Sequence, residues 1–272
     1  MKGIIKMKKI GFIGAGNMAT AIVGGILRSG SADGKHVMMY DVLTEKLNAL
    51  AAEKGIITGK SAGEVVDFAD ITVLAVKPQN YAEVLESIRE SVTEQKVIVT
   101  IAAGISTDYI AGALGVDCPM VRVMPNTPLL LGMGATALSR RNISDEDFDY
   151  VYRMFSEGGT AVILDESSMN SVIAVNGSSP AYVYLFAKAM VDYAVNEGID
   201  KDAAMKLVCA TLKGSAEMLE RSGDTPDELI RKVSSPGGTT LKALEKLDEK
   251  DFYNSILEAM AACTKRAEEL SK

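Results

Sequence analysis

The stretch Ile10-Gly11-Phe12-Ile13-Gly14-Ala15-Gly16-Asn17-Met18-Ala19 decides the fold of the chain. It places a G-x-G-x-x-A pattern directly after an apolar run and at the start of a helix that we expect to continue to about Ser29. In this pattern Gly14 makes a tight turn, Gly16 lets a pyrophosphate approach the backbone, and Ala19 keeps the helix close to the strand. Because backbone N–H groups and the helix dipole attract phosphate at such a turn, the stretch predicts a strand–turn–helix unit that binds a dinucleotide. Glycine turns also serve plain packing, so the prediction depends on the strands and helices expected in the rest of the chain.

Short apolar runs alternate with helical stretches over the first 165 or so residues. We expect strands over residues 9–13, 36–40, 71–76, 97–101, 121–124, 135–138 and 161–164. The runs ITVLAV (71–76) and VIVTI (97–101) are continuous, which is typical of parallel strands covered on both faces. The pattern predicts the α/β class, with an N-terminal Rossmann-type doubly wound sheet.

After about Asp165 the strand pattern stops and helical patterns take its place, over residues 180–197, 200–221 and 252–270. In the second of these, Ala204, Leu207, Val208 and Thr211 have the i, i+3, i+4, i+7 spacing of one helix face. We therefore expect a dinucleotide-binding domain over residues 1–165 and an all-helical domain over residues 166–272. Helices with one apolar stripe each rarely bury everything alone, so this second domain is expected to pair with a second copy.

Composition excludes several classes of protein. The 272 residues are 47% hydrophobic and 24% charged, which is ordinary for a globular protein, and the net charge of −7 leaves no basic footprint for nucleic acid. The single histidine, His36, argues against a histidine-based triad or a multi-histidine metal site, and we expect no metal. The three cysteines form no C-x-x-C pair and look like free thiols of a reducing compartment, which favours a cytoplasmic location.

The uncharged segment Ile10–Leu27 comes after a basic N-terminal stretch and can imitate a signal peptide or a membrane span. It contains five glycines together with Asn17 and Thr20, which favours the strand–turn–helix interpretation. We therefore expect neither a targeting segment nor a membrane partner.

Asp41 ends the second predicted strand, twenty-two residues beyond Ala19. An acidic residue there can accept hydrogen bonds from both adenosine ribose hydroxyls and repel a 2′-phosphate, so Asp41 favours NADH over NADPH. The alternative is that Asp41 caps the helix expected near Thr44.

The third and fourth strands run into Ala75-Val76-Lys77-Pro78 and Ala102-Ala103-Gly104, at carboxyl ends where open α/β sheets bind ligands. Lys77 is equally compatible with an ordinary solvated lysine.

Three further stretches are rich in turn residues: RVMPNTP (122–128), NGSSPAY (176–182) and SSPGGTTL (234–241). The last precedes a helix, where the N–H groups of Gly238, Thr239 and Thr240 would form a small anion site suited to a carboxylate. The Thr240 hydroxyl can donate to, or accept from, a neighbouring nitrogen. An ordinary N-cap with a glycine turn is the alternative.

In this order, the G-A-G turn, A-V-K-P, A-A-G, M-P-N-T-P, G-S-S-P-A-Y and S-S-P-G-G-T-T-L-K-A-L resemble the pyrroline-5-carboxylate reductase family. The resemblance covers nearly the whole chain, and its last motif is highly specific. It implies a Rossmann domain, a helical dimerisation domain that interleaves with its partner, and often higher assemblies of dimers. It also implies reduction of the cyclic imine pyrroline-5-carboxylate to L-proline by NADPH or NADH, the last step of proline biosynthesis.

The resemblance also implies site residues, carried over position by position. Cofactor contacts are expected at Ile13, Gly14, Ala15, Gly16, Asn17, Met18, Ala75, Val76, Lys77, Pro78, Ile101, Ala102 and Ala103, with Asn126 and Thr127 towards the nicotinamide. Contacts to the substrate carboxylate and imine are expected at Ser235, Gly238, Thr239 and Thr240. Three positions depart from the family: many members have a small polar residue at Asp41, a ribose-contacting asparagine is replaced by Ala62, and Ser179 replaces a common glycine.

Hydride transfer to an imine needs little acid–base machinery when the substrate enters protonated, because the iminium carbon is already electrophilic. Thr240 would orient the nitrogen, and would relay a proton if the imine arrives neutral. A hydroxy-acid dehydrogenase would need a stronger acid for its developing alkoxide.

Two other functions remain in view. A β-hydroxyacid dehydrogenase uses a lysine followed three residues later by asparagine, but here Lys188 is followed by Val191. A sensor that binds NAD(H) without turnover would need no second anion site beside the nicotinamide.

Overall fold

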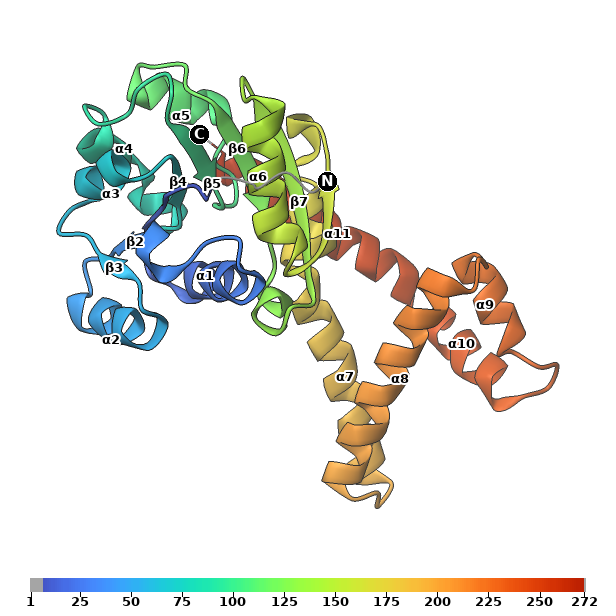
Figure 1. Ribbon diagram of the computed structural model, residues 1–272. Coiled ribbons are helices and arrows are strands. Elements are labelled where there is room, and N and C mark those ends of the chain that lie inside the picture. Colours follow the sequence, from blue (N-terminus) through green and yellow to red (C-terminus); the bar gives the residue numbers. More distant parts are fainter. Residues whose placement is uncertain (1–6, 272) are drawn as a thin grey trace, which may run out of the picture. The chain divides into compact units, whose positions relative to one another are not determined.

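The computed structural model describes residues 7–271, and its first part is built on one eight-stranded sheet (Figure 1). The strands are β1 (Ile10–Ile13), β2 (Val37–Tyr40), β3 (Ile57–Thr58), β4 (Ile71–Leu74), β5 (Val97–Thr100), β6 (Met120–Met124), β7 (Gly134–Arg141) and β8 (Gly159–Ile163). Their order is β3-β2-β1-β4-β5-β6-β7-β8. All neighbours are parallel except β6 and β7, which are antiparallel. The strand order reverses at β1, which confirms the predicted Rossmann-type sheet.

Helices cover both faces of this sheet. They are α1 (Asn17–Ser29), α2 (Thr44–Lys54), α3 (Ala62–Phe68), α4 (Tyr81–Ile88), α5 (Thr107–Leu114) and α6 (Asp145–Ser156). Side chains alternate along the strands, so Phe12 belongs to the core cluster that includes residues of α1, α2 and α6, whereas Ile13 belongs to the cluster that includes residues of α3, α4 and α5. Gly11 lies close against α3. A Cβ at this position would be only 2.5 Å from Val65 Cγ1, so the helix leaves no room for a side chain there.

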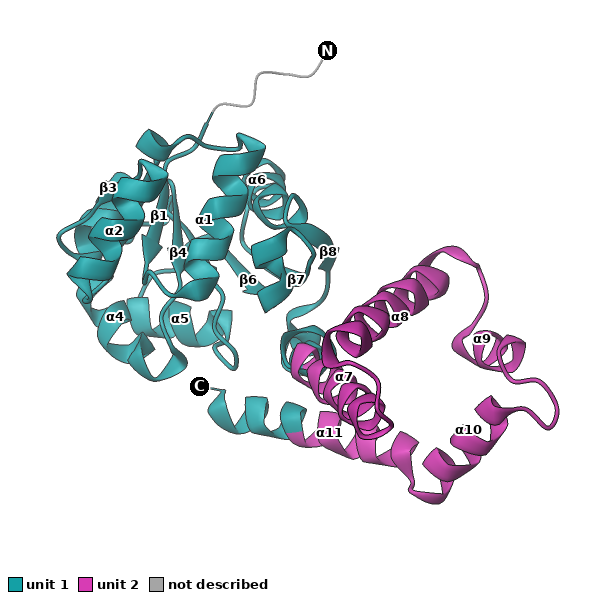
Figure 2. Cartoon of the chain, turned by 90° about the horizontal axis from the view of Figure 1, so that it is seen from below, with its two compact units in different colours: residues 1–178, 263–272 teal, residues 179–262 magenta. Residues whose placement is uncertain are grey.

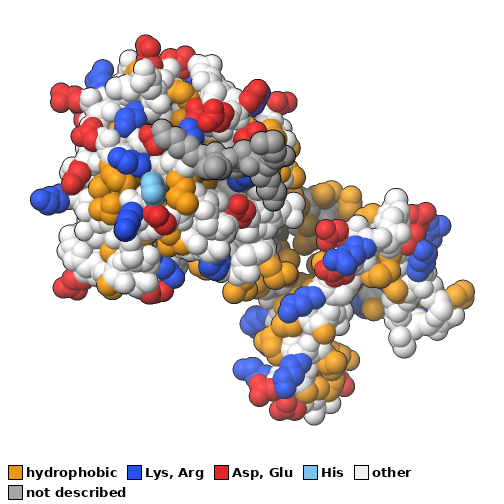
Figure 3. Space-filling view, viewed as in Figure 1, with side chains coloured by type: hydrophobic (Ala, Val, Ile, Leu, Met, Phe, Trp, Pro, Cys, Tyr) orange, Lys and Arg blue, Asp and Glu red, His pale blue; other side chains and the backbone are white. Residues whose placement is uncertain are grey.

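The rest of the chain is helical, as the sequence predicts. Its helices are α7 (Ser179–Asn196), α8 (Lys201–Arg221), α9 (Pro226–Lys232), α10 (Thr239–Glu249) and α11 (Phe252–Leu270). Val191, Ala204 and Val208 join α7 to α8 in a small core. Much of the predicted apolar stripe of α8 stays exposed, however. The exposed fraction of Leu207 is 64% and that of Leu219 is 53%. Figure 3 shows apolar side chains spread over the helices of this part. A single chain therefore leaves these faces uncovered.

The chain divides into two compact units, Met1–Ser178 with Cys263–Lys272, and Ser179–Ala262 (Figure 2). This division differs from the expected boundary at residue 165 in two ways. The segment after β8 stays with the sheet, where Met169 is fully buried, and the final turns of α11 belong to the same unit. There Ala267 packs in one cluster with Met124, Met169 and Ile173.

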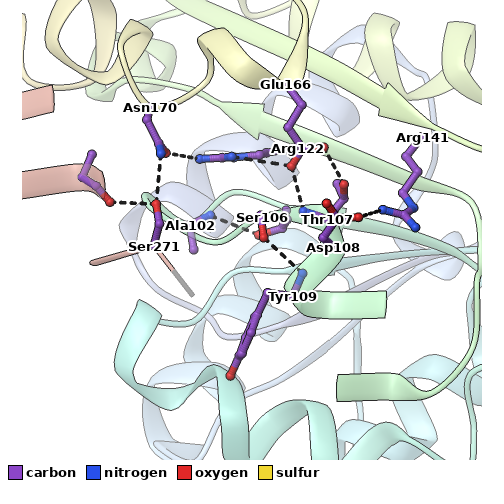
Figure 4. A network of polar contacts seen from close by, with 12 residues as sticks. Ala102, Ser106, Thr107, Asp108, Tyr109, Arg122, Arg141, Glu166, Asn170 and Ser271 are labelled. Atoms are coloured by element: carbon purple, nitrogen blue, oxygen red, sulfur yellow. Dashed lines mark hydrogen bonds and ion pairs between the residues drawn. The ribbon is translucent and has the colours of Figure 1, made fainter. Parts of the chain in front are cut away.

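A polar cluster holds these segments to the sheet (Figure 4). Arg122 of β6, only 3% exposed, donates to Asn170 Oδ1 at 2.6 Å and lies 3.5 Å from Glu166 Oε1. Glu166 also accepts the backbone N–H and the hydroxyl of Thr107 at the start of α5. Asn170 in turn donates to Ser271 Oγ at 3.0 Å, just beyond α11. We refer to these five residues as the Arg122 cluster.

Burial lowers the pKa of the Arg122 guanidinium, and the charge and hydrogen bond of Glu166 oppose that shift. A buried cation of this kind needs its carboxylate partner, since removal of the carboxylate leaves an uncompensated charge.

None of the helices within residues 7–271 combines the length and the apolar character that a membrane span requires.

Glu166→Gln should lower the free energy of unfolding by about 1–3 kcal/mol, because Arg122 loses its counter-charge while Thr107 keeps an acceptor oxygen. Urea unfolding followed by circular dichroism measures this difference. The control is Glu269→Gln, which removes a largely exposed ion pair to Arg266 and should change stability by less than about 0.5 kcal/mol. Equal losses in the two variants would show that the Arg122 cluster contributes no special stability.

Candidate functional site

The turn after β1 brings two strand ends into close backbone contact. Gly14 has a φ of +106°, and a Cβ there would lie 2.6 Å from the carbonyl oxygen of Ala75. Its N–H donates to Tyr40 O at 2.7 Å, and the N–H of Ala75 donates to Ile13 O at 2.8 Å. Only glycine fits this position, since both the dihedral angle and the space exclude a side chain.

Gly16 has a different reason to be glycine. It is the N-cap of α1 with an ordinary φ of −70°, and a Cβ there would meet no atom within 4 Å. The first turn of α1 has neither a side-chain cap nor an acidic residue. The helix start therefore presents N–H groups and the positive end of the dipole to an open space, which fits a phosphate.

The Asp41 carboxylate braces this turn. Oδ2 accepts the N–H of Ala15 at 2.6 Å and Oδ1 accepts the N–H of Leu43 at 2.9 Å. Asp41 does not serve as N-cap of α2, because Leu43 occupies that position. Each carboxylate oxygen keeps a further lone pair that can accept a ribose hydroxyl. The N–H of Ala15 is already used within the protein, which leaves the N–H groups at the start of α1 for phosphate.

The segments after β4 and β5 lie at the same edge of the sheet. The registers pair Ile13 with Leu74 and Leu74 with Thr100, and Ile101 N–H donates to Leu74 O at 3.4 Å. The predicted cofactor residues Ala75, Val76, Lys77 and Pro78, and Ile101, Ala102 and Ala103, thus gather beside the glycine turn. Lys77 is exposed, Ala102 is buried, and Ile101 and Ala103 are half-buried.

Tyr81 holds these two strand ends together from inside the core. It is fully buried, and its hydroxyl donates to Leu74 O at 2.9 Å and bonds to Thr100 Oγ1 at 2.7 Å. Burial raises the pKa of Tyr81, so the hydroxyl stays a donor. Sequence reasoning missed this residue because it lies in an ordinary helical pattern.

Asn126 and Thr127 come after β6, whose parallel pairing with β5 brings them to the same edge. Asn126 is 7% exposed, and its carboxamide is engaged within the protein: Oδ1 accepts Ala135 N–H at 2.9 Å and Nδ2 donates to Asn176 O at 3.2 Å. Thr127 is exposed. The structure therefore places Asn126 as a support and leaves Thr127 facing solvent.

The predicted substrate residues form a separate cluster in the second unit, between α9 and α10. Gly237 has a φ of +72°, and a Cβ on Gly238 would lie 2.6 Å from Ser235 Oγ. Gly238 is the N-cap of α10, whose first turn, with Thr239 and Thr240, has no side-chain cap and no acidic residue. In contrast, α9 is closed by a capping box. This second glycine-led helix start is suited to a carboxylate.

Other candidate chemistry is not supported within residues 7–271. No group of three or more His, Cys, Asp and Glu side chains is arranged there to hold a metal ion. Lys188 is exposed and pairs with Asp192 one turn along α7. Ala62 is buried at the start of α3 and offers no polar group to a ribose.

A Rossmann-type sheet with an open glycine turn, followed by helices with a second uncapped, glycine-led helix start, is typical of NAD(P)-dependent oxidoreductases. Comparison with known proteins identifies the family. Residues 166–270 match the family described as "Pyrroline-5-carboxylate reductase dimerisation", and residues 9–104 match "NADP oxidoreductase coenzyme F420-dependent". The chain belongs to the pyrroline-5-carboxylate reductase family, the NAD(P)-dependent oxidoreductases of proline biosynthesis.

The similarity extends over the whole length of the relatives. The chain is 41% identical to the pyrroline-5-carboxylate reductase of Escherichia coli, over 97% of this chain and 99% of that one. It is 35% identical to the enzyme of Methanosarcina acetivorans, over 97% and 98%. Among solved structures, a pyrroline-5-carboxylate reductase from Coxiella burnetii matches with a TM-score of 0.89 at 30% identity, over 98% and 100% of the two chains. The Plasmodium falciparum pyrroline carboxylate reductase with NADP bound matches with a TM-score of 0.91 at 28% identity, over 99% and 100%.

The two glycines of the turn should respond differently to alanine. Gly14→Ala should destabilise the fold by about 1–3 kcal/mol or more, because of its positive φ and the contact with Ala75. Gly16→Ala should change stability by less than about 1 kcal/mol, yet weaken NADH binding by at least about tenfold, because the added methyl group occupies the open approach to α1. Thermal melting and calorimetric titration with NADH measure the two effects. A Gly16→Ala variant with normal NADH affinity would contradict the phosphate assignment.

Proposed function

We propose that the chain reduces pyrroline-5-carboxylate to L-proline through the residues of the glycine turn, the neighbouring strand ends and the substrate cluster. The observation that carries the proposal is the presence of two uncapped, glycine-led helix starts, at Gly16 and at Gly238. One suits the pyrophosphate of a dinucleotide and the other suits the carboxylate of the substrate. The Escherichia coli and Methanosarcina acetivorans relatives support the same reaction.

The first unit would hold the cofactor. Residues 13–18 would bind the pyrophosphate, Asp41 the adenosine ribose, and the segments 75–78, 101–103 and 126–127 the nicotinamide half, since a dinucleotide extends across the carboxyl ends of such a sheet. When bound, the reduced nicotinamide supplies the hydride.

The substrate cluster would position the ring of the imine. The N–H groups of Gly238, Thr239 and Thr240 would bind its carboxylate, with Ser235 beside them, and the Thr240 hydroxyl would hold the ring nitrogen. Because an iminium carbon is electrophilic without further activation, orientation is the main contribution required of these residues.

The cofactor preference depends on charge at the end of β2. Asp41 would repel the 2′-phosphate of NADPH, and its neighbours Val42 and Leu43 are exposed aliphatic residues that offer no cation. We therefore propose that this chain prefers NADH, whereas the Plasmodium relative was solved with NADP bound.

The exposed apolar faces of α7 and α8 favour association with a second copy of the chain. The dimerisation family match implies a homodimer, and we propose that residues 166–272 act together as the dimerisation and substrate region, with higher assemblies of dimers. The three free thiols are consistent with our proposal of a reducing, cytoplasmic compartment.

Thr240→Ala should lower kcat/KM for pyrroline-5-carboxylate by more than about tenfold, which corresponds to 1.4 kcal/mol of transition-state stabilisation. Wild-type protein should oxidise NADH with this imine and release proline. The loss of reduced nicotinamide absorbance measures the rate. Thr225→Ala is the matched control, because it removes a hydroxyl from the capping box of α9 in the same unit and should leave kcat/KM unchanged. Activity of Thr240→Ala within about twofold of wild type would exclude the role of its hydroxyl.

Two substitutions, Asp41→Ser and Asp41→Asn, separate the effect of the Asp41 charge from the effect of its hydrogen bonds to Ala15 and Leu43. Both variants remove the charge and should raise the ratio of kcat/KM for NADPH over NADH. Asn keeps one acceptor oxygen in a side chain of the same shape, so Asp41→Asn should preserve NADH affinity better than Asp41→Ser. Steady-state kinetics with both cofactors measures the ratio. An unchanged ratio in both variants would refute the ribose assignment.

A further inference from the structure

A single π-helical turn, Ile173–Gly177, lies between the sheet and α7. Such turns are rare and occur often at functional sites. This one carries Asn176, whose side chain is 7% exposed and belongs to the same compact unit as the sheet. The residue lies within the turn-rich stretch that the sequence singled out, but neither the expected cofactor contacts nor the substrate cluster uses it.

The Asn176 amide joins the two ends of the β6–β7 connection. Nδ2 donates to the carbonyl of Met124, the last residue of β6, at 2.7 Å, and to the carbonyl of Ala135 in β7 at 2.9 Å. The backbone carbonyl of Asn176 accepts Asn126 Nδ2 at 3.2 Å, and Asn126 Oδ1 accepts the N–H of Ala135 at 2.9 Å. Three of these hydrogen bonds form a closed ring among Asn126, Ala135 and Asn176, and the fourth ties Asn176 to Met124.

The ring holds the segment nearest the expected nicotinamide. Residues 125–127 come after β6 at the sheet edge where the glycine turn and the ends of β4 and β5 also lie. Asn126 is fixed by the ring, and Thr127 extends from it into solvent as the first residue of a short helical turn, Thr127–Leu131. The position of Thr127 therefore depends on the Asn176 amide, which donates to the carbonyl groups of both Met124 and Ala135.

We propose that Asn176 is a positioning residue for the nicotinamide half of the cofactor, acting through Asn126 and Thr127. The inference rests on the proposed function, since that function places the nicotinamide at this edge. Asn176 touches neither cofactor nor substrate in this scheme. It fixes the backbone against which the nicotinamide would lie.

The chemistry of the ring specifies an amide. Two N–H groups on one nitrogen serve two carbonyl acceptors, which a carboxylate of the same shape cannot do. Asn176→Asp would set an oxygen against the carbonyls of Met124 and Ala135, and Asn176→Ala would leave both carbonyls without this donor. Each change should loosen residues 125–127 while Asp41 and the glycine turn stay as they are.

The test compares NADH with ADP-ribose, which has the same adenosine and pyrophosphate but no nicotinamide. Calorimetric titration of full-length Asn176→Ala and Asn176→Asp should show NADH affinity reduced by at least about fivefold and ADP-ribose affinity within about twofold of wild type. Asn170→Ala is the matched control, because it removes an amide from the Arg122 cluster on the same connecting segment. It should lower the melting temperature without changing the ratio of the two affinities.

The affinity measurements test the role of Asn176 independently of whether the chain reduces pyrroline-5-carboxylate. Equal losses for NADH and ADP-ribose, or unchanged affinity for both, would overturn the role of Asn176. If one variant does not fold, the ratio in the other decides. If the wild type binds NADH but does not reduce pyrroline-5-carboxylate, the proposed function fails, and the affinity ratio still tests Asn176. In an active enzyme, kcat should also fall by at least about fivefold in Asn176→Ala, with a larger isotope effect from NADH deuterated at the transferred position.

Discussion

The close approach of Gly14 to the carbonyl of Ala75 constrains the ligand edge of the first unit, because a Cβ at Gly14 would lie 2.6 Å from that oxygen. The turn after β1 lies against the segment after β4, and Gly14 adopts a positive φ of +106° there. The start of α1 then lies over the point where the strand order reverses. Asp41 on one side and the 75–78 and 101–103 segments on the other are arranged around this contact. The open space at Gly16 exists because Gly14 has already made the turn.

Buried polar side chains support this edge from behind. Tyr81 bonds to Leu74 and Thr100, and Asn176 bonds to Met124 and Ala135, so each joins the ends of two neighbouring strands. Their partners are mostly backbone carbonyls, which would be costly to leave unpaired in the interior. Because Tyr81 and Asn176 are both buried, they support the edge without occupying its exposed side. A site of this kind can be rigid although few of its own side chains are charged.

Much of the fold could be predicted from the sequence, and the exceptions have physical causes. The apolar runs around Val73 and Val99 predict their strands because both faces of each strand are buried. The strand Ile57–Thr58 was missed because two residues carry no periodicity, and the antiparallel direction of β7 is invisible in a run of apolar residues. The Arg122 cluster could not be predicted, since an arginine in a strand gives no sign of which distant carboxylate it pairs with. For the site, the apolar runs predicted that the segments after β4 and β5 lie at the carboxyl ends of parallel strands, as does the glycine turn after β1. The sequence could not show that the Asn126 side chain is engaged internally, because its partner lies fifty positions away.

The return of α11 to the sheet unit has a consequence for how the chain is made. Residues 263–271 supply Ala267 to a cluster beneath β6 and β7 and give Ser271 to the Arg122 cluster, but they leave the ribosome only after all of residues 179–262. Domains generally fold in order of synthesis. Here the first unit must wait, with the surface around Met124 and Met169 incomplete, until the helical unit has been translated. The nascent dinucleotide-binding unit therefore reaches its final packing late, close to the moment when the apolar helix faces of the second unit first become able to meet those of another chain.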